Sequence, residues 1–180
     1  QYHAAFGGLR KYDFKKNEVV VHPQVFNKKQ INYLNKCMLL IATKKSRYSS
    51  DYAAKVVNKM KNVKEIENLH KIVRNASLLY KNALTAKTNE EIQQLFTKMT
   101  MLSWEHKSSL NLIQDSEVMK QINKVKAIGV EGVKLCGAGG SGFFLLIDKP
   151  EIINQVKNRI EPSLIVEVAI VNDGLKIEKF

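Results

Sequence analysis

"KLCGAGGSGFFLLI", residues 134–147, places four glycines directly before a run of apolar residues. Gly137, Gly139 and Gly142 spell the G-x-G-x-x-G pattern of dinucleotide-binding folds, in which a helix follows the last glycine. Here the segment 143–147 follows instead, an apolar run of strand length that leads into no helical pattern. The stretch therefore predicts a glycine-rich connection between two strands.

A loop of this composition can turn several backbone N–H groups toward one side, and that arrangement binds phosphate oxygens. It is not a Walker A loop, because no Gly-Lys-Ser/Thr sequence closes it, and glycine clusters also form plain tight turns or close backbone contacts. Both interpretations stay open at this point. The candidate phosphate-binding residues are Lys134, Gly137, Ala138, Gly139, Gly140, Ser141 and Gly142.

The composition indicates a folded, basic protein. The chain has 180 residues, of which 44% are hydrophobic, enough for a real core. Its 29 Lys and Arg residues against 17 Asp and Glu residues give a net charge of +12, which favours anionic partners or forms a solvated basic surface. The lysines occur in short pairs rather than in a long run, so a nucleic-acid-binding tail is not indicated. A stand-alone basic binding module, for nucleic acid or an acidic protein, remains the alternative function.

Other residue types limit the setting of the protein. Cys37 and Cys136 lie in separate apolar stretches, so we expect no disulfide framework and a reducing, cytoplasmic environment. No apolar stretch reaches the roughly 18 residues of a membrane span, so we expect no membrane partner. The four histidines have no metal-ligand spacing with the cysteines, so we expect no bound structural metal.

Strand and helix patterns alternate without a strict β-α-β repeat, so the expected class is α+β. Helical periodicity, the Thr88 capping box and the Gly129 stop mark the helices, and apolar alternation marks the strands. The expected helices are 27–35, 50–86 with a break at 62–63, 88–106, 115–129 and 150–160. The expected strands are 9–14 and 18–22 as a hairpin, 38–43, one on each side of the glycines, and a closing pair at 164–171 and 175–180.

Four segments together resemble the GHMP small-molecule kinases. "GVKLCGAGGSGFFLL" (132–146) is similar to the third motif of that family, a Lys-Leu-x-Gly-Ala-Gly-Gly-x-Gly segment before an apolar strand. The other three are "QYHAAFGGL" (1–9), "TKKSRYSSDYAAK" (43–55) and "LSWEHKSSL" (102–110), which resemble segments of the heptose-phosphate kinase branch in the same order. Lys44 and Ser141 depart from the pattern, since the family usually has glycine at both positions.

This resemblance implies the carboxyl-terminal half of a kinase that transfers a phosphoryl group from ATP, with Mg²⁺, to a sugar or sugar phosphate. Residues 1–30 would be a strand hairpin region that completes the amino-terminal domain, and 31–180 would be the carboxyl-terminal domain, a ferredoxin-like two-layer sandwich. The family's phosphate-wrapping motif and its catalytic Asp would precede Gln1, so we expect no catalytic residue in this chain. We expect the chain alone to be inactive and its partner to be the missing amino-terminal half; an oligomer remains possible.

Six residues are candidates for substrate contact. The resemblance places Gln1 and Tyr2 beside the missing catalytic Asp. Ser46, Arg47 and Ser49 follow a predicted strand and precede a helix, where a guanidinium, hydroxyls and helix N–H groups can bind an anion. In the alternative, Ser49 only caps the helix and Arg47 is solvated. Trp104 can stack on a sugar, although packing in or beside the core is the favoured interpretation.

Overall fold

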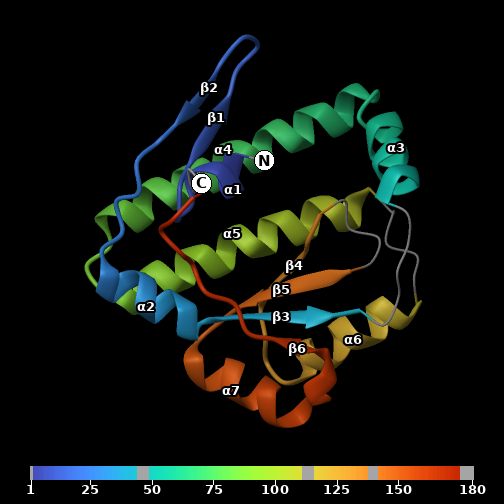
Figure 1. The fold of residues 1–180 in the computed structure, drawn as a ribbon. Coiled ribbons are helices and arrows are strands. Elements are labelled where there is room, and N and C mark those ends of the chain that lie inside the picture. The colour runs from blue at the N-terminus through green and yellow to red at the C-terminus, as the bar shows by residue number, and fades with distance from the viewer. Residues whose placement is uncertain (1, 44–48, 111–115, 138–141, 175–180) are drawn as a thin grey trace, which may run out of the picture.

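The structure, a computed structural model, describes residues 2–43, 49–110, 116–137 and 142–174. Its centre is a four-stranded antiparallel sheet with the strand order β4-β5-β3-β6 (Figure 1). The strands are β3 (Met38–Ala42), β4 (Gly132–Leu135), β5 (Phe143–Ile147) and β6 (Ile165–Val166). Helices connect β3 to β4 and β5 to β6, while β4 and β5 form a hairpin. This is the ferredoxin-like arrangement expected from the sequence, and it confirms the α+β class.

The helices begin where capping residues predict them. Asn27 and Thr88 each form a capping box, with Gln30 and Glu91, and the Asn62 side chain accepts a hydrogen bond from the Lys64 N–H. The predicted break at 62–63 is therefore confirmed, while Asp115 lies outside the described residues. The helices are α2 (Lys28–Lys36), α3 (Ser49–Lys59), α4 (Val63–Thr85), α5 (Asn89–Ser109), α6 (Ser116–Ala127) and α7 (Pro150–Arg159).

The main core lies between one face of the sheet and the helices α6 and α7. Strand register puts alternate residues of β3, β4 and β5 side by side on this face, and each is at most 1% exposed: Leu39, Ile41, Val133, Leu135, Phe144 and Leu146. The helices contribute Val118, Ile122, Val125, Ile153 and Val156. The other face is more open, because Leu40 and Leu145 are only half-buried and Phe143 is 42% exposed.

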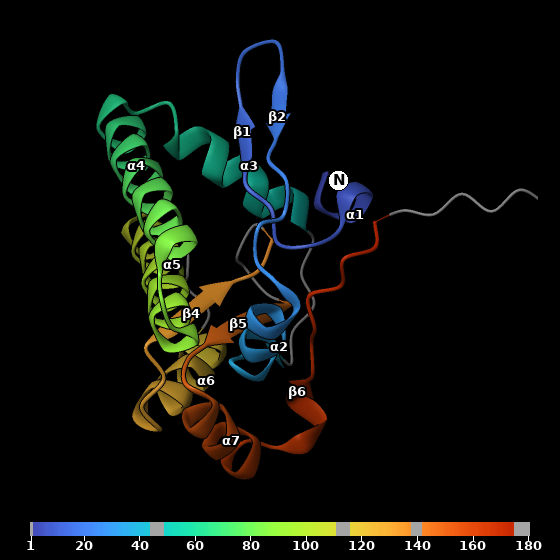
Figure 2. The same ribbon diagram turned by 90° about the vertical axis from the view of Figure 1, so that its left-hand side faces the viewer.

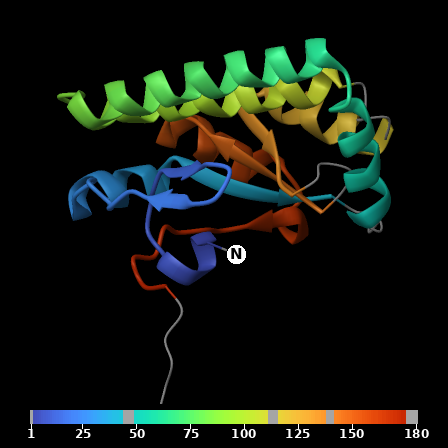
Figure 3. The same ribbon diagram turned by 90° about the horizontal axis from the view of Figure 1, so that it is seen from above.

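A second apolar cluster joins the amino-terminal part of the chain to the long helices. α4 and α5 run side by side along the molecule (Figure 3), and Ala83 and Ile92 from them pack with Phe26, Ile31 and Leu34. The predicted hairpin is confirmed as β1 (Tyr12–Phe14) and β2 (Val19–Val21), which pair antiparallel. Within the described residues, no helix combines the length and the apolar character needed to cross a membrane.

The predicted closing pair of strands is wrong over most of its first member. Only β6 pairs with β3, after a short 3₁₀ turn at Pro162–Leu164, and residues 167–171 form no strand. Their β-branched residues favour a strand, but a strand also needs a neighbour for its backbone groups. Here the Ile170 N–H donates to the side chain of Asn35 and the Val171 carbonyl accepts from Gly8. Residues 175–180 lie outside the described residues.

A short helix near the amino terminus was not predicted. α1 (Tyr2–Phe6) ends at Gly7, whose φ of +58° is the left-handed conformation common after helices. The backbone here contacts the carboxyl-terminal segment closely, since a Cβ on Gly174 would lie 2.1 Å from the Ala5 carbonyl oxygen. Figure 2 shows α1 beside this segment, and the approach explains why glycine is needed at position 174.

Candidate functional site at the glycine-rich end of the sheet

The sheet has one end at which the glycine segment, the last residue before the 44–48 gap and the end of α5 come together (Figure 1). β4 and β5 lead into and out of the segment, and their ladder continues one step further because the Cys136 N–H donates to the Phe143 carbonyl at 2.9 Å. The strands thus fix both ends of the glycine segment, whose central residues Ala138, Gly139, Gly140 and Ser141 lie outside the described residues.

Thr43, at the end of β3, holds the exit of the segment. Its backbone N–H donates to the Gly142 carbonyl at 2.7 Å, and its Oγ1 accepts from the Gly142 N–H at 2.8 Å. Both backbone groups of Gly142 are therefore bound to one residue of the central strand. This double contact fixes the direction in which the chain re-enters the sheet.

Lys107, in the last turn of α5, holds the entrance. Its Nζ donates to the Leu135 carbonyl at 2.6 Å and to the Gly137 carbonyl at 2.7 Å. Burial lowers the pKa of Lys107 below its ordinary 10.5, and the neighbouring charge of Lys134 lowers it further. Lys107 thus acts as a clamp on the backbone just before and within the glycine segment.

The segment is open on its outer side. Gly137 and Gly142 have φ values of +58° and +95°, and a Cβ on either would meet no described atom within 4 Å. Glycine is therefore required here by backbone conformation and not by crowding from the described residues.

The charge at this end is positive. Lys134 is exposed on β4, and its influence on the pKa of Lys107 shows that the two ammonium groups lie near one another. Cys136 lies two residues after Lys134, and burial raises the pKa of its thiol above the ordinary 9.0, although both lysines act in the opposite direction. The two lysines thus place positive charge beside the glycine segment, where it can attract an anion.

The structure brings together only some of the predicted site residues. Lys134, Gly137 and Gly142 meet at the glycine-rich end, and Ser49 is the first residue of α3. Gln1, Ser46 and Arg47 lie outside the described residues.

Tyr2 and Trp104 have other contacts. Tyr2 packs edge-on against Phe14, with ring centroids 5.7 Å apart, and also lies beside Tyr12. Trp104 is half-buried against the main core, and the Lys126 ammonium lies 4.8 Å from its ring centroid. Packing therefore accounts for the position of Trp104 without a sugar.

Sequence reasoning missed Lys107 and Thr43 as site residues. Lys107 belongs to the "LSWEHKSSL" segment, in which we had singled out only Trp104 as a candidate, three residues earlier on the same helix. Thr43 is the last residue of a predicted strand, and nothing local marks its contact with Gly142, which is 99 residues away in the sequence.

Comparison with known proteins gives a structural answer. No protein-family model and no curated sequence matches the chain. Several solved structures do match. Among them are D-glycero-D-manno-heptose 1-phosphate kinase from Bacteroides thetaiotaomicron (20% identity, TM-score 0.60, 99% of this chain and 48% of that one), a protein assigned as a sugar kinase from Campylobacter jejuni (18%, 0.63, 97% and 46%), and L. major mevalonate kinase in complex with R-mevalonate (17%, 0.61, 94% and 51%).

The fold is that of the GHMP kinases. At these identities the comparison establishes the fold alone. The chain spans about half the length of each of these kinases. This share agrees with the expectation that the chain corresponds to a carboxyl-terminal half of such a kinase.

Proposed function

We propose that the chain is the carboxyl-terminal half of a GHMP-type kinase that transfers a phosphoryl group from ATP to a sugar or sugar phosphate. One observation carries the proposal: the segment that resembles the family's third motif is the β4–β5 connection of a sheet with the GHMP kinase fold, clamped by Lys107 and Thr43. A sugar is favoured over mevalonate because the segments 1–9, 43–55 and 102–110 resemble the heptose-phosphate branch.

In this proposal the glycine-rich end supports ATP binding and does not carry out proton transfer. Lys134 and the open backbone beside Gly137 and Gly142 provide positive charge and space for phosphate oxygens or for the phosphate-binding loop of the other half. ATP supplies the transferred phosphoryl group, and Mg²⁺ neutralises part of its charge. The described residues hold no cluster of three metal-binding side chains, so ATP and the other half would hold Mg²⁺.

The remaining roles follow the same division. Residues 1–30 complete the amino-terminal domain, and 31–180 form the carboxyl-terminal one. The catalytic Asp precedes Gln1 and accepts the proton of the sugar hydroxyl. Ser46, Arg47 and Ser49 bind the anionic substituent of the sugar, and Gln1 and Tyr2 line its site.

The test is ATP turnover by the full-length protein that contains this chain, measured as ADP release with a panel of sugars and sugar phosphates. We expect one sugar class to stimulate turnover. The 180-residue chain alone should show no stimulated turnover, because positioning and charge stabilisation cannot act with half of the site missing. Stimulated turnover by the chain alone would contradict the proposal that it holds only half of the active site. A full-length protein whose ATP turnover no sugar stimulates would contradict the proposed kinase activity.

A binding module remains the second candidate because of the net charge of +12. It predicts an inactive full-length protein that binds single-stranded RNA, with an affinity that falls steeply as salt is raised. Fluorescence anisotropy at two salt concentrations, beside the turnover assay, separates the two functions.

A further inference from the structure

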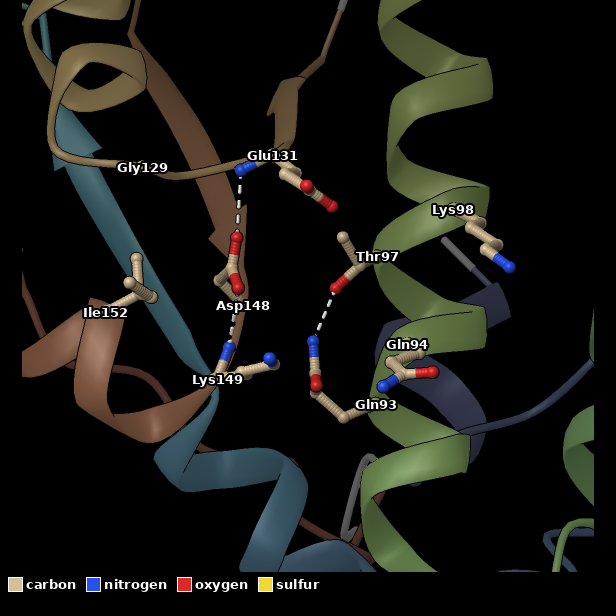
Figure 4. A pocket seen from close by; sticks show the side chains of 9 residues that line it. All are labelled: Gln93, Gln94, Thr97, Lys98, Gly129, Glu131, Asp148, Lys149 and Ile152. Carbon is tan, nitrogen blue, oxygen red and sulfur yellow. Dashed lines mark hydrogen bonds between the residues drawn. The ribbon is translucent and has the colours of Figure 1, made fainter.

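The opposite end of the β4–β5 hairpin carries a polar pocket of about 390 Å³ (Figure 4). Its walls come from α5, from the turn before β4 and from the start of α7. It is separated from the glycine segment by the length of β5, about 16 Å at roughly 3.3 Å per residue. A pocket of this volume is in the range that holds small-molecule ligands. It is therefore a separate site.

A buried amide defines the floor of the pocket. Gln93 is only 2% exposed, and its Nε2 donates to Thr97 Oγ1 at 2.7 Å. Thr97 Oγ1 in turn donates its single hydrogen to the Ile147 carbonyl at 2.8 Å, so it must accept from Gln93, and the amide orientation is fixed. The Oε1 of Gln93 is then a buried acceptor with no donor among the described residues. Since buried polar atoms are nearly always hydrogen-bonded, the pocket lacks a donor group.

A carboxylate adds a second acceptor. Asp148 is 7% exposed, and its two oxygens accept the backbone N–H groups of Glu131 and Lys149, each at 2.8 Å. These bonds hold the carboxylate in one orientation and leave further lone pairs on its oxygens. Figure 4 shows Asp148 on the side of the pocket opposite Gln93. A ligand between them would meet acceptors on two sides.

The rim is charged but balanced. The exposed side chains of Lys98 and Lys149 contribute two positive charges, while the exposed Glu131 and the buried Asp148 contribute two negative ones. A ligand of large net charge thus gains little from this pocket. Figure 4 shows the Lys149 side chain extending toward Gln93, so its ammonium can donate to a group that occupies the space between them.

We propose that this pocket binds a small neutral polyol. A hydroxyl both donates and accepts, so one set of hydroxyls can donate to Gln93 Oε1 and Asp148 and accept from Lys149. An anion would be repelled by the carboxylates of Asp148 and Glu131, and a cation by the ammonium groups of Lys98 and Lys149. The inference uses no residue of the glycine-rich end and stands independently of the proposed kinase activity.

The experiment measures myo-inositol binding to the full-length protein by saturation-transfer NMR, with inorganic phosphate as the charged probe. Gln93→Leu removes the acceptor at nearly constant shape. Gln121→Leu is the matched control, because Gln121 is also buried with an Oε1 that lacks a described donor, but it lies on α6. We expect millimolar myo-inositol binding by the wild type and by Gln121→Leu, and at least tenfold weaker binding by Gln93→Leu.

Equal binding by Gln93→Leu and the wild type would overturn the proposal, as would binding of phosphate alone or of neither probe. If Gln93→Leu does not fold, as judged by circular dichroism, the exposed Lys149→Met takes its place. That variant should bind myo-inositol at least threefold more weakly, and unchanged binding would again overturn the site. A myo-inositol signal from a sugar site at the other end of the sheet would be insensitive to both variants.

Discussion

Cys37 and Cys136 lie at opposite ends of the sheet, and their thiols report opposite electrostatic surroundings. Burial raises the pKa of both. At Cys37 the carboxylates of Glu151, Asp148 and Glu90 raise it further, to about 12. At Cys136 the ammonium groups of Lys134 and Lys107 partly offset the burial. The charged groups that act on the thiol are thus cationic at the glycine-rich end and anionic at the Asp148 end.

The glycines at the two ends also differ. At the Asp148 end, a Cβ on Gly132 would lie 2.2 Å from the Ile147 carbonyl oxygen, so glycine is required by the close approach of two strands. At the other end, Gly137 and Gly142 have positive φ and open space beside them. Glycine is therefore required at the Asp148 end by close packing of two strands. At the glycine-rich end it is required by backbone conformation, and hydrogen bonds from Lys107 and Thr43 hold the backbone in place.

The largest effect should come from Gly132→Ala. The new methyl group would overlap the Ile147 carbonyl and also approach Thr97, so β4 and β5 must separate. Overpacking of this kind costs about 3 kcal/mol of the free energy of unfolding. Urea unfolding of the full-length protein measures the loss. A loss below about 1 kcal/mol would show that the strands adjust easily and that the distinction between the two ends is wrong.

Lys107→Met should mainly reduce turnover. It removes both donors to the Leu135 and Gly137 carbonyls while keeping an unbranched apolar side chain. Loss of the charged hydrogen bonds should cost about 1.5–3 kcal/mol and, under the proposed kinase function, lower the kcat of the full-length protein about tenfold or more.

The matched control for Lys107→Met is Lys126→Met, which removes a lysine that contacts Trp104 instead of the loop. Steady-state kinetics of both variants, with ATP and sugar varied in turn, should show the large loss only in Lys107→Met. Equal kinetic constants in the two variants would show that the Lys107 hydrogen bonds do not contribute to the proposed phosphate site.

Gly137→Ala should have a smaller effect, of about 1 kcal/mol, because only the left-handed conformation opposes the methyl group. Gly137→Asn should cost less than Gly137→Ala, since asparagine tolerates this conformation better. At Gly132 the same pair of substitutions should rank the other way, because asparagine is larger. Urea midpoints of the four variants test both rankings, and a Gly137→Asn variant less stable than Gly137→Ala would point to crowding instead of conformation.

The sequence predicted the elements well where the signal is local. The Thr88 capping box marked a helix start, polarity and periodicity predicted the helix at 27–35 and the break at 62–63, and the glycine segment was correctly placed between two strands. It could not predict contacts between distant residues. The hydrogen bonds between Thr43 and Gly142 and between Gly8 and Val171 join groups that are far apart in the chain. The bond from Gly8 takes up the Val171 carbonyl, which would otherwise pair in the strand that local propensity favours at 167–171.

The smallest effect concerns thiol chemistry at the two ends. Iodoacetamide reacts with the thiolate, so the rate of alkylation should rise with pH at Cys136 well before it rises at Cys37, whose pKa is raised to about 12 and whose side chain is 0% exposed to the reagent. Removing a nearby positive charge destabilises a thiolate, so Lys134→Met should move the Cys136 profile to higher pH. The Cys37 profile should stay where it is, because the cationic residue removed lies at the far end of the sheet.

Alkylation of each cysteine, followed by mass spectrometry across a pH series, gives both profiles from one sample. A Cys136 profile that Lys134→Met leaves unchanged would mean that Lys134 does not act on this thiol, and the cationic influence at the glycine-rich end would then rest on Lys107.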